Sequence, residues 1–146
     1  MAKPLQVVII TGMSGAGKTV AVQSFEDLGY FVIDNMLPNL AEKFADVIQN
    51  AAEFDQMAMV NDSRSQAFYD QILPCIQRLK NRTDLKVEVL FLDASDVELV
   101  SRYKETRRSH PLSRQGGVLE GIQKERTLLS DLKSQADVVI DRSEEH

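Results

Sequence analysis

Eight residues near the N-terminus restrict the fold of this chain more than any other segment. Residues 12–19 read Gly-Met-Ser-Gly-Ala-Gly-Lys-Thr and match the pattern G-x-x-x-x-G-K-[ST] at every fixed position. They follow the continuous apolar run of residues 6–11 and precede an amphipathic stretch at 19–28. A buried strand, a glycine-rich turn and a helix in this order predict a phosphate-binding loop of the P-loop type.

Each residue type in the loop has a chemical reason to be there. Glycines allow successive backbone N–H groups to point at a phosphate, and the helix that follows adds its positive N-terminal end. Lys18 would place its charge between the β- and γ-phosphates, and the Thr19 hydroxyl would bind Mg²⁺. An accidental glycine-rich turn is the alternative, and the flanking strand and helix disfavour it. We therefore assign the phosphates to Gly12, Met13, Ser14, Gly15, Ala16, Gly17, Lys18 and Thr19.

The rest of the chain alternates short apolar runs with amphipathic stretches, which is typical of βαβ units. Strands are expected at 6–11, 30–34, 56–61, 87–93 and 136–141, with helices at 19–28, 40–51, 65–82, 96–106 and 118–135. In the expected helix at 65–82, Pro74 suggests a kink or a break. The pattern predicts an α/β, three-layer P-loop NTPase fold of the kinase-like kind: a five-stranded parallel sheet with helices on both faces, in one domain over residues 1–146.

The composition of the chain limits the classes of partner that we expect it to bind. The formal net charge of -5 offers no argument for binding nucleic acid or an anionic membrane. No apolar run is long enough for a membrane span or a signal peptide, so we expect no membrane and a cytoplasmic location. The single cysteine, Cys75, cannot form an internal disulfide and is interpreted as a small packed thiol.

Several polar residues stand where strands are expected to end, at the edge where open α/β sheets bind ligands. Asp34 and Asn35 follow the second strand, as ligand contacts or as a helix cap, and both readings stay open. Asp62 follows the third strand and Asp93 the fourth, so both are candidates for the Mg²⁺ site. The apolar strand that precedes Asp93 has the form of a Walker B segment, and spacing alone favours it slightly.

A basic segment precedes the last predicted helix. Arg107 and Arg108 are candidates for contacts with the transferring phosphate, as in the arginine-bearing lid of small P-loop kinases. The alternative is a solvated basic helix face. His110 is interpreted as an orienting or surface residue.

The chain resembles the RapZ/YvcJ family of bacterial nucleotide-binding proteins. The resemblance covers nearly the whole chain and is carried by GMSGAGKTVAVQSFEDLGYFVIDNM, the Asp62–Arg64 D-x-R, LFLDASDVELVSRYKETRRSHPL and ERTLLSDLKSQADVVID. It implies the N-terminal domain of a protein about twice as long, which binds and slowly hydrolyses ATP and GTP. It also implies a guanine-nucleotide contact at Asp62, Ser63, Arg64 and Ser65, and this moves the metal assignment towards Asp62. Asn61 departs from the family, where an apolar residue is usual.

Three functions are compatible with these residues. The first is a regulatory NTPase domain, with Lys18, Arg107 and Arg108 acting on the phosphates and Thr19, Asp62 and Asp93 around Mg²⁺. The second is a kinase whose Asp34 and Asn35 hold the acceptor hydroxyl of a small molecule. The third is a binding module gated by nucleotide. A protein or RNA partner would act through the absent C-terminal half, since the resemblance associates RNA delivery with that half. The sequence does not indicate a preference for ATP or for GTP, because the chain has no N-K-x-D motif that would read the base.

Overall fold

The structure is a computed structural model of the 146-residue chain. It describes residues 4–13, 16–34, 36–51, 54–61, 66–100 and 117–141, excluding the side chains of 66–69 and 117–118. The strands are β1 (Leu5–Gly12), β2 (Phe31–Ile33), β3 (Gln56–Val60), β4 (Leu85–Asp93) and β5 (Val138–Asp141). The helices are α1 (Lys18–Asp27), the 3-10 helix η1 (Pro38–Leu40), α2 (Ala41–Ala51), α3 (Gln66–Lys80) and α5 (Gly117–Ser134). Residues 96–100 are also helical.

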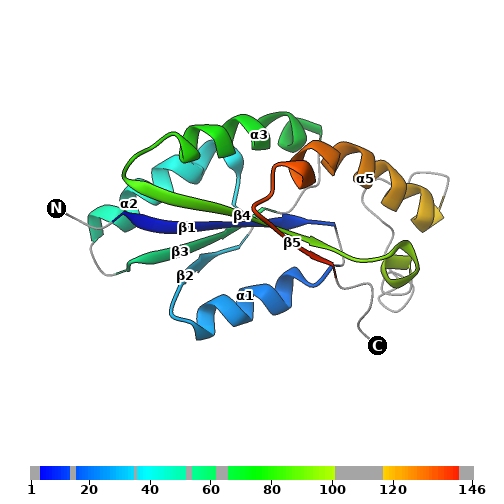
Figure 1. The fold of residues 1–146 in the computed structure, drawn as a ribbon, viewed down its shortest axis with the longest axis horizontal. Coiled ribbons are helices and arrows are strands. Elements are labelled where there is room, and N and C mark those ends of the chain that lie inside the picture. The colour runs from blue at the N-terminus through cyan, green and yellow to red at the C-terminus, as the bar shows by residue number, and fades with distance from the viewer. Residues whose placement is uncertain are drawn as a thin grey trace.

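The five strands form one parallel sheet in the order β2-β3-β1-β4-β5. In the central strand β1, Ile10 pairs with Val60 of β3 on one side and with Leu90 of β4 on the other. Helix α1 lies on one face of the sheet, and α2, α3 and α5 lie on the opposite face (Figure 1). This arrangement confirms the three-layer, kinase-like P-loop fold.

The two faces of the sheet are covered unequally. Helix α1 has no buried residue. The helices on the opposite face bury apolar side chains: Ala41, Ala45 and Ile48 from α2, Ile72, Cys75, Ile76 and Leu79 from α3, and Ile122, Leu129 and Leu132 from α5. Most of the helical contribution to the core therefore comes from the α2, α3 and α5 side. Cys75 belongs to this core, and burial raises the pKa of its thiol.

Helix α2 carries two sets of residues at helical spacing, and the structure buries one of them. Leu40, Phe44, Val47 and Ala51 repeat at helical spacing in the sequence. In the structure Phe44 and Val47 are exposed. The buried positions of α2 are Ala41, Ala45 and Ile48. Both stripes have helical spacing, so periodicity alone could not choose between them.

Helices α3 and α1 each show one further local feature. Helix α3 continues through Pro74 without a break. Helix α1 ends in a Schellman motif, in which the Tyr30 amide donates to Phe25 O at 3.0 Å and Gly29 has a φ of +89°. The rings of Phe25 and Tyr30 lie edge to face with centroids 4.8 Å apart, which supplies the apolar contact of that motif. No helix in the described ranges is both long and apolar enough to cross a membrane.

Candidate functional site

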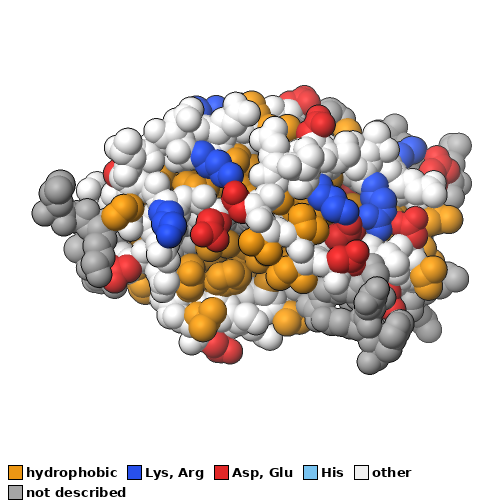
Figure 2. All heavy atoms as spheres, in the orientation of Figure 1, with side chains coloured by type: hydrophobic (Ala, Val, Ile, Leu, Met, Phe, Trp, Pro, Cys, Tyr) orange, Lys and Arg blue, Asp and Glu red, His pale blue; other side chains and the backbone are white. Residues whose placement is uncertain are grey.

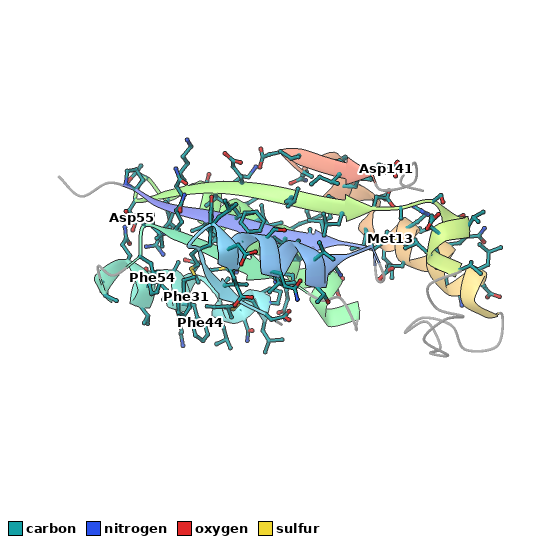
Figure 3. The ribbon with its side chains drawn as sticks, turned by 90° about the horizontal axis from the view of Figure 1, so that it is seen from below. Met13, Phe31, Phe44, Phe54, Asp55 and Asp141 are labelled. Carbon is teal, nitrogen blue, oxygen red and sulfur yellow. The ribbon has the colours of Figure 1, made fainter. Side chains whose placement is uncertain are left out.

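The carboxyl end of β1 turns sharply at Gly12. Its φ of +138° lies in the region that favours glycine, and a Cβ built there would lie 2.1 Å from Leu92 O. The next residue, Met13, is buried, and its amide donates to the same Leu92 carbonyl at 3.0 Å. Figure 3 shows Met13 at the end of β1. Only glycine fits between β1 and β4 here, so Gly12 sets the direction in which the loop leaves the sheet.

The second half of the loop starts helix α1. Gly17 is its N-cap, with a left-handed φ of 97°, and the Ala16 amide donates to Met13 O at 3.1 Å. The first N–H groups of a helix have no partner within the helix. Gly17 has no side chain to cap them, and no acidic residue stands in the first turn of α1. This helix end therefore suits an anion, and the exposed Thr19 lies in its first turn.

On the other side of β1, Asn61 joins three segments. Its amide donates to Ile10 O of β1 at 2.9 Å, and its side-chain Nδ2 donates to Met36 O at 2.8 Å. The Met36 amide in turn donates to Val60 O at 2.8 Å. Asn61 is 2% exposed, and these bonds satisfy it. The residue therefore holds the segment after β2 against the end of β3, immediately before Asp62.

Asp93, at the end of β4, accepts hydrogen bonds from two cationic side chains of α5. Arg126 Nη1 donates to its Oδ1 at 2.9 Å, and Lys133 Nζ donates to its Oδ2 at 2.8 Å. The Ala94 amide adds a third bond at 2.7 Å, and Arg126 Nε also donates to Asp96 at 2.6 Å. The side chain of Asp93 is 4% exposed. Asp93, Asp96, Arg126 and Lys133 form what we call the β4–α5 ion cluster.

The β4–α5 ion cluster keeps Asp93 charged. Burial alone would raise the pKa of this carboxyl, but the hydrogen bonds from Lys133, the Ala94 amide and Arg126 outweigh burial and lower it. The positive charges of Arg126 and Lys133 also oppose the approach of a further cation such as Mg²⁺. The Mg²⁺ role of Asp93 stays a prediction, and in this structure its carboxylate is engaged in attaching α5 to the sheet.

The other predicted residues divide into two groups. Gly12, Met13, Ala16, Gly17, Lys18 and Thr19 come together between β1 and α1, and Asp34 is exposed after β2. Ten other predicted residues lie outside the described ranges, and their roles stay predictions. They are Ser14, Gly15, Asn35, Asp62, Ser63, Arg64, Ser65, Arg107, Arg108 and His110. Sequence reasoning missed Arg126 and Lys133. Their seven-residue spacing puts them on one face of a helix, which was the available signal.

A cavity of about 490 Å³ adjoins the ion cluster. Its lining combines Met13 of the loop, Phe91 of β4, Leu129 of α5 and Val139 of β5 with three cluster residues, Asp93, Arg126 and Lys133. The cavity therefore lies on the α5 side of the sheet, and Val139 points towards that side.

Comparisons with known proteins agree with this geometry. The model of the RapZ-like N-terminal domain matches residues 5–146. A "nucleotide-binding protein" of Limosilactobacillus fermentum is 67% identical over 141 residues, which is 97% of this chain and 49% of the relative. A protein of the same name from Limosilactobacillus reuteri is 70% identical over 139 residues, covering 95% of this chain and 48% of the relative. The chain thus spans about half the length of the curated relatives it matches.

Solved structures agree on the fold. Shikimate kinase from Acinetobacter baumannii superposes with a TM-score of 0.59 at 18% identity, over 93% of this chain and 83% of the kinase. The tunicamycin resistance protein of Deinococcus radiodurans gives 0.58 at 15% identity, over 96% of this chain and 86% of that protein. At such identities the likeness concerns the fold alone. The family match, the relatives and the phosphate-loop geometry lead to one conclusion: the chain belongs to the RapZ-like family, as its N-terminal domain.

Proposed function

We propose that this chain binds a nucleoside triphosphate with its phosphates at residues 12–19, and that it hydrolyses ATP and GTP slowly as part of a regulatory protein. The observation that carries the proposal is the backbone at Gly12 and Gly17. Gly12 fits where a Cβ would meet the Leu92 carbonyl, and Gly17 starts α1 without a side-chain cap. The curated relatives are named nucleotide-binding proteins, which supports the same ligand.

Each residue has a proposed task within this function. The charge of Lys18 would balance the β- and γ-phosphates, and the Thr19 hydroxyl would bind Mg²⁺ together with Asp62. Bound Mg²⁺ supplies positive charge that neutralises phosphate oxygens. Arg107 and Arg108 would contact the phosphates, and Asp62–Ser65 would contact a guanine nucleotide. In place of a metal role for Asp93, we propose that it anchors α5.

Calorimetric titration with Mg²⁺ and either ATP or GTP tests the binding. Lys18→Ala should weaken affinity by about tenfold or more, because it removes a charge-assisted contact to phosphate. Lys86→Ala is the matched control, since this exposed lysine lies seven residues before the end of β4, about 20 Å from the carboxyl edge. Equal affinities of Lys18→Ala and wild type, with unchanged circular dichroism, would overturn the loop assignment.

A kinase acting on a small-molecule hydroxyl is the second candidate. Asp34 supports it, because its carboxylate is exposed directly after β2, at the carboxyl edge of the sheet. Phosphorus NMR of reactions with ATP and hydroxyl-bearing metabolites separates the two functions. A phosphorylated product that disappears in Asp34→Asn would favour the kinase, and free phosphate alone would favour the NTPase. Tight binding with no turnover would favour a module gated by nucleotide.

Location and partners follow as proposals. The cytoplasm is the proposed location, and the buried Cys75 thiol is compatible with its reducing conditions. A protein or RNA partner would act through the second half that the longer relatives contain.

A further inference from the structure

The face of the sheet that carries α1 is covered over only part of its width. Helix α1 packs against β1, β2 and β3. Seen from that side, α1 crosses the sheet near β1, and β4 and β5 lie clear of it (Figure 3). Although α1 lies against the centre of the sheet, none of its residues is buried. Parallel sheets in α/β proteins have helices over both faces, so this half of the face lacks its usual cover within the described residues.

The uncovered part is apolar and comes mainly from β5. Val138 and Ile140 are 47% and 42% exposed. Val139 lies between them and lines the cavity on the α5 side, so Val138 and Ile140 point to the α1 side. They pair in register with Leu90 and Leu92 of β4. Figure 2 shows hydrophobic side chains gathered between β5 and α1. We call Leu90, Val138 and Ile140 the β5 apolar surface.

The boundary of the β5 apolar surface indicates how its partner is built. Towards the amino end of β4, the α1-side positions change to the exposed Glu88 and Lys86. A partner that fits is therefore apolar over β5 and polar over the charged pair, as an amphipathic helix is. An added strand would pair with the outer edge of β5 and leave the outward side of Val138 and Ile140 exposed.

We propose that an amphipathic helix from the second half of the longer relatives docks on the β5 apolar surface. The matching model is that of an N-terminal domain, so in such relatives the remaining half of the chain comes after β5. That half is about as long as the part matched here, which is ample for a helix that returns across β4 and β5. Docking would bury Val138 and Ile140 and thereby hold the two halves together. This inference does not depend on nucleotide binding.

Cysteine reporters on adjacent residues test the proposal. Val138→Cys and Val139→Cys are prepared in the 146-residue chain and in the same chain continued with the second half of the L. reuteri relative. The rate of modification by a thiol-reactive dye is measured for each. The native Cys75 is 1% exposed and should react slowly. In the longer chain Val138→Cys should react at least about tenfold more slowly than in the short one, and Val139→Cys should change by less than about twofold.

The matched pair makes the result decisive. Val138 and Val139 are the same residue type with similar exposure, but they face opposite sides of the sheet. Equal rates in both chains, or equal protection of both reporters, would overturn the proposal. Slowing of Val138→Cys in the short chain as its concentration rises would show instead that a second copy covers this surface. Ile140→Cys repeats the measurement on the same face, and circular dichroism checks that each variant folds.

Discussion

At the scale of residues, Gly12 and Gly29 share a positive φ but differ in their surroundings. A Cβ at Gly29 would have no atom within 4 Å, whereas one at Gly12 would meet backbone atoms of Leu92. Gly29→Ala should therefore cost only the conformational strain, about 1 to 2 kcal/mol of unfolding free energy. Gly12→Ala should cost clearly more, about 3 kcal/mol or above, since β1 and β4 must separate. Urea denaturation measures both, and equal losses would contradict the close approach of Gly12 to β4.

The β4–α5 ion cluster also belongs to the residue scale. Asp93→Asn should lower the unfolding free energy by about 1.5 to 3 kcal/mol, because it removes the charge that accepts hydrogen bonds from Arg126 and Lys133. Asp96→Asn is the control, because its carboxylate meets the same arginine but is 39% exposed and should cost about 1 kcal/mol or less. Denaturant titration compares the two. A stable Asp93→Asn with weakened Mg²⁺-nucleotide binding would restore the metal role.

At the scale of elements, helix α2 has two stripes of residues at helical spacing, and only one of them is buried. Ile48 is 6% exposed and Val47 is 62% exposed, although they are neighbours on one helix. Ile48→Ala should lower the unfolding free energy by about 2 to 5 kcal/mol through lost burial and a new cavity. Val47→Ala should change it by less than about 0.5 kcal/mol. Thermal or urea unfolding of the two variants checks this, and the reverse order would contradict the burial of Ile48 against the sheet.

At the scale of the whole molecule, acid should loosen the attachments between the layers. Asp93 holds α5 to β4, and Asp137 holds the start of β5 through the Val89 amide and Lys80 of α3. Burial would raise the pKa of Asp137, but the bonds from Val89 and Lys80 outweigh it, so its pKa, like that of Asp93, lies below the usual value. Carboxyls with a depressed folded pKa stabilise the protein above their unfolded pKa of about 3.9 and lose this contribution as the pH falls further.

The unfolding free energy should accordingly stay level near neutral pH and fall below about pH 5. The unfolding free energy of Asp137→Asn should fall less steeply than that of the wild type over this range, because one of the carboxyls that must take up a proton is gone. Urea titrations at a series of pH values measure both slopes. Wild-type stability that is constant down to about pH 3 would show that these bonds contribute little.

The pattern of the chain was sufficient for the architecture. Apolar runs such as the one before Gly12 predict buried parallel strands, because only strands covered on both faces are apolar at consecutive positions. The loop sequence predicts both the turn and the start of α1, since glycine is required where the backbone has a positive φ. Serine is a favoured residue immediately before a helix, and the Oγ of Ser95 accepts a hydrogen bond from the Glu98 amide at 3.2 Å.

The sequence by itself determined the properties that local chemistry sets. These are the order of strands and helices along the chain, the glycine turn and the helix caps. Only the tertiary structure decided which face of α2 is buried, that Asp93 holds Arg126 and Lys133, and that the side chains of Val138 and Ile140 are exposed. These depend on contacts between residues far apart in the chain. A carboxylate after an apolar strand looks the same in sequence whether a metal or a distant arginine meets it, and packing alone settles which one does.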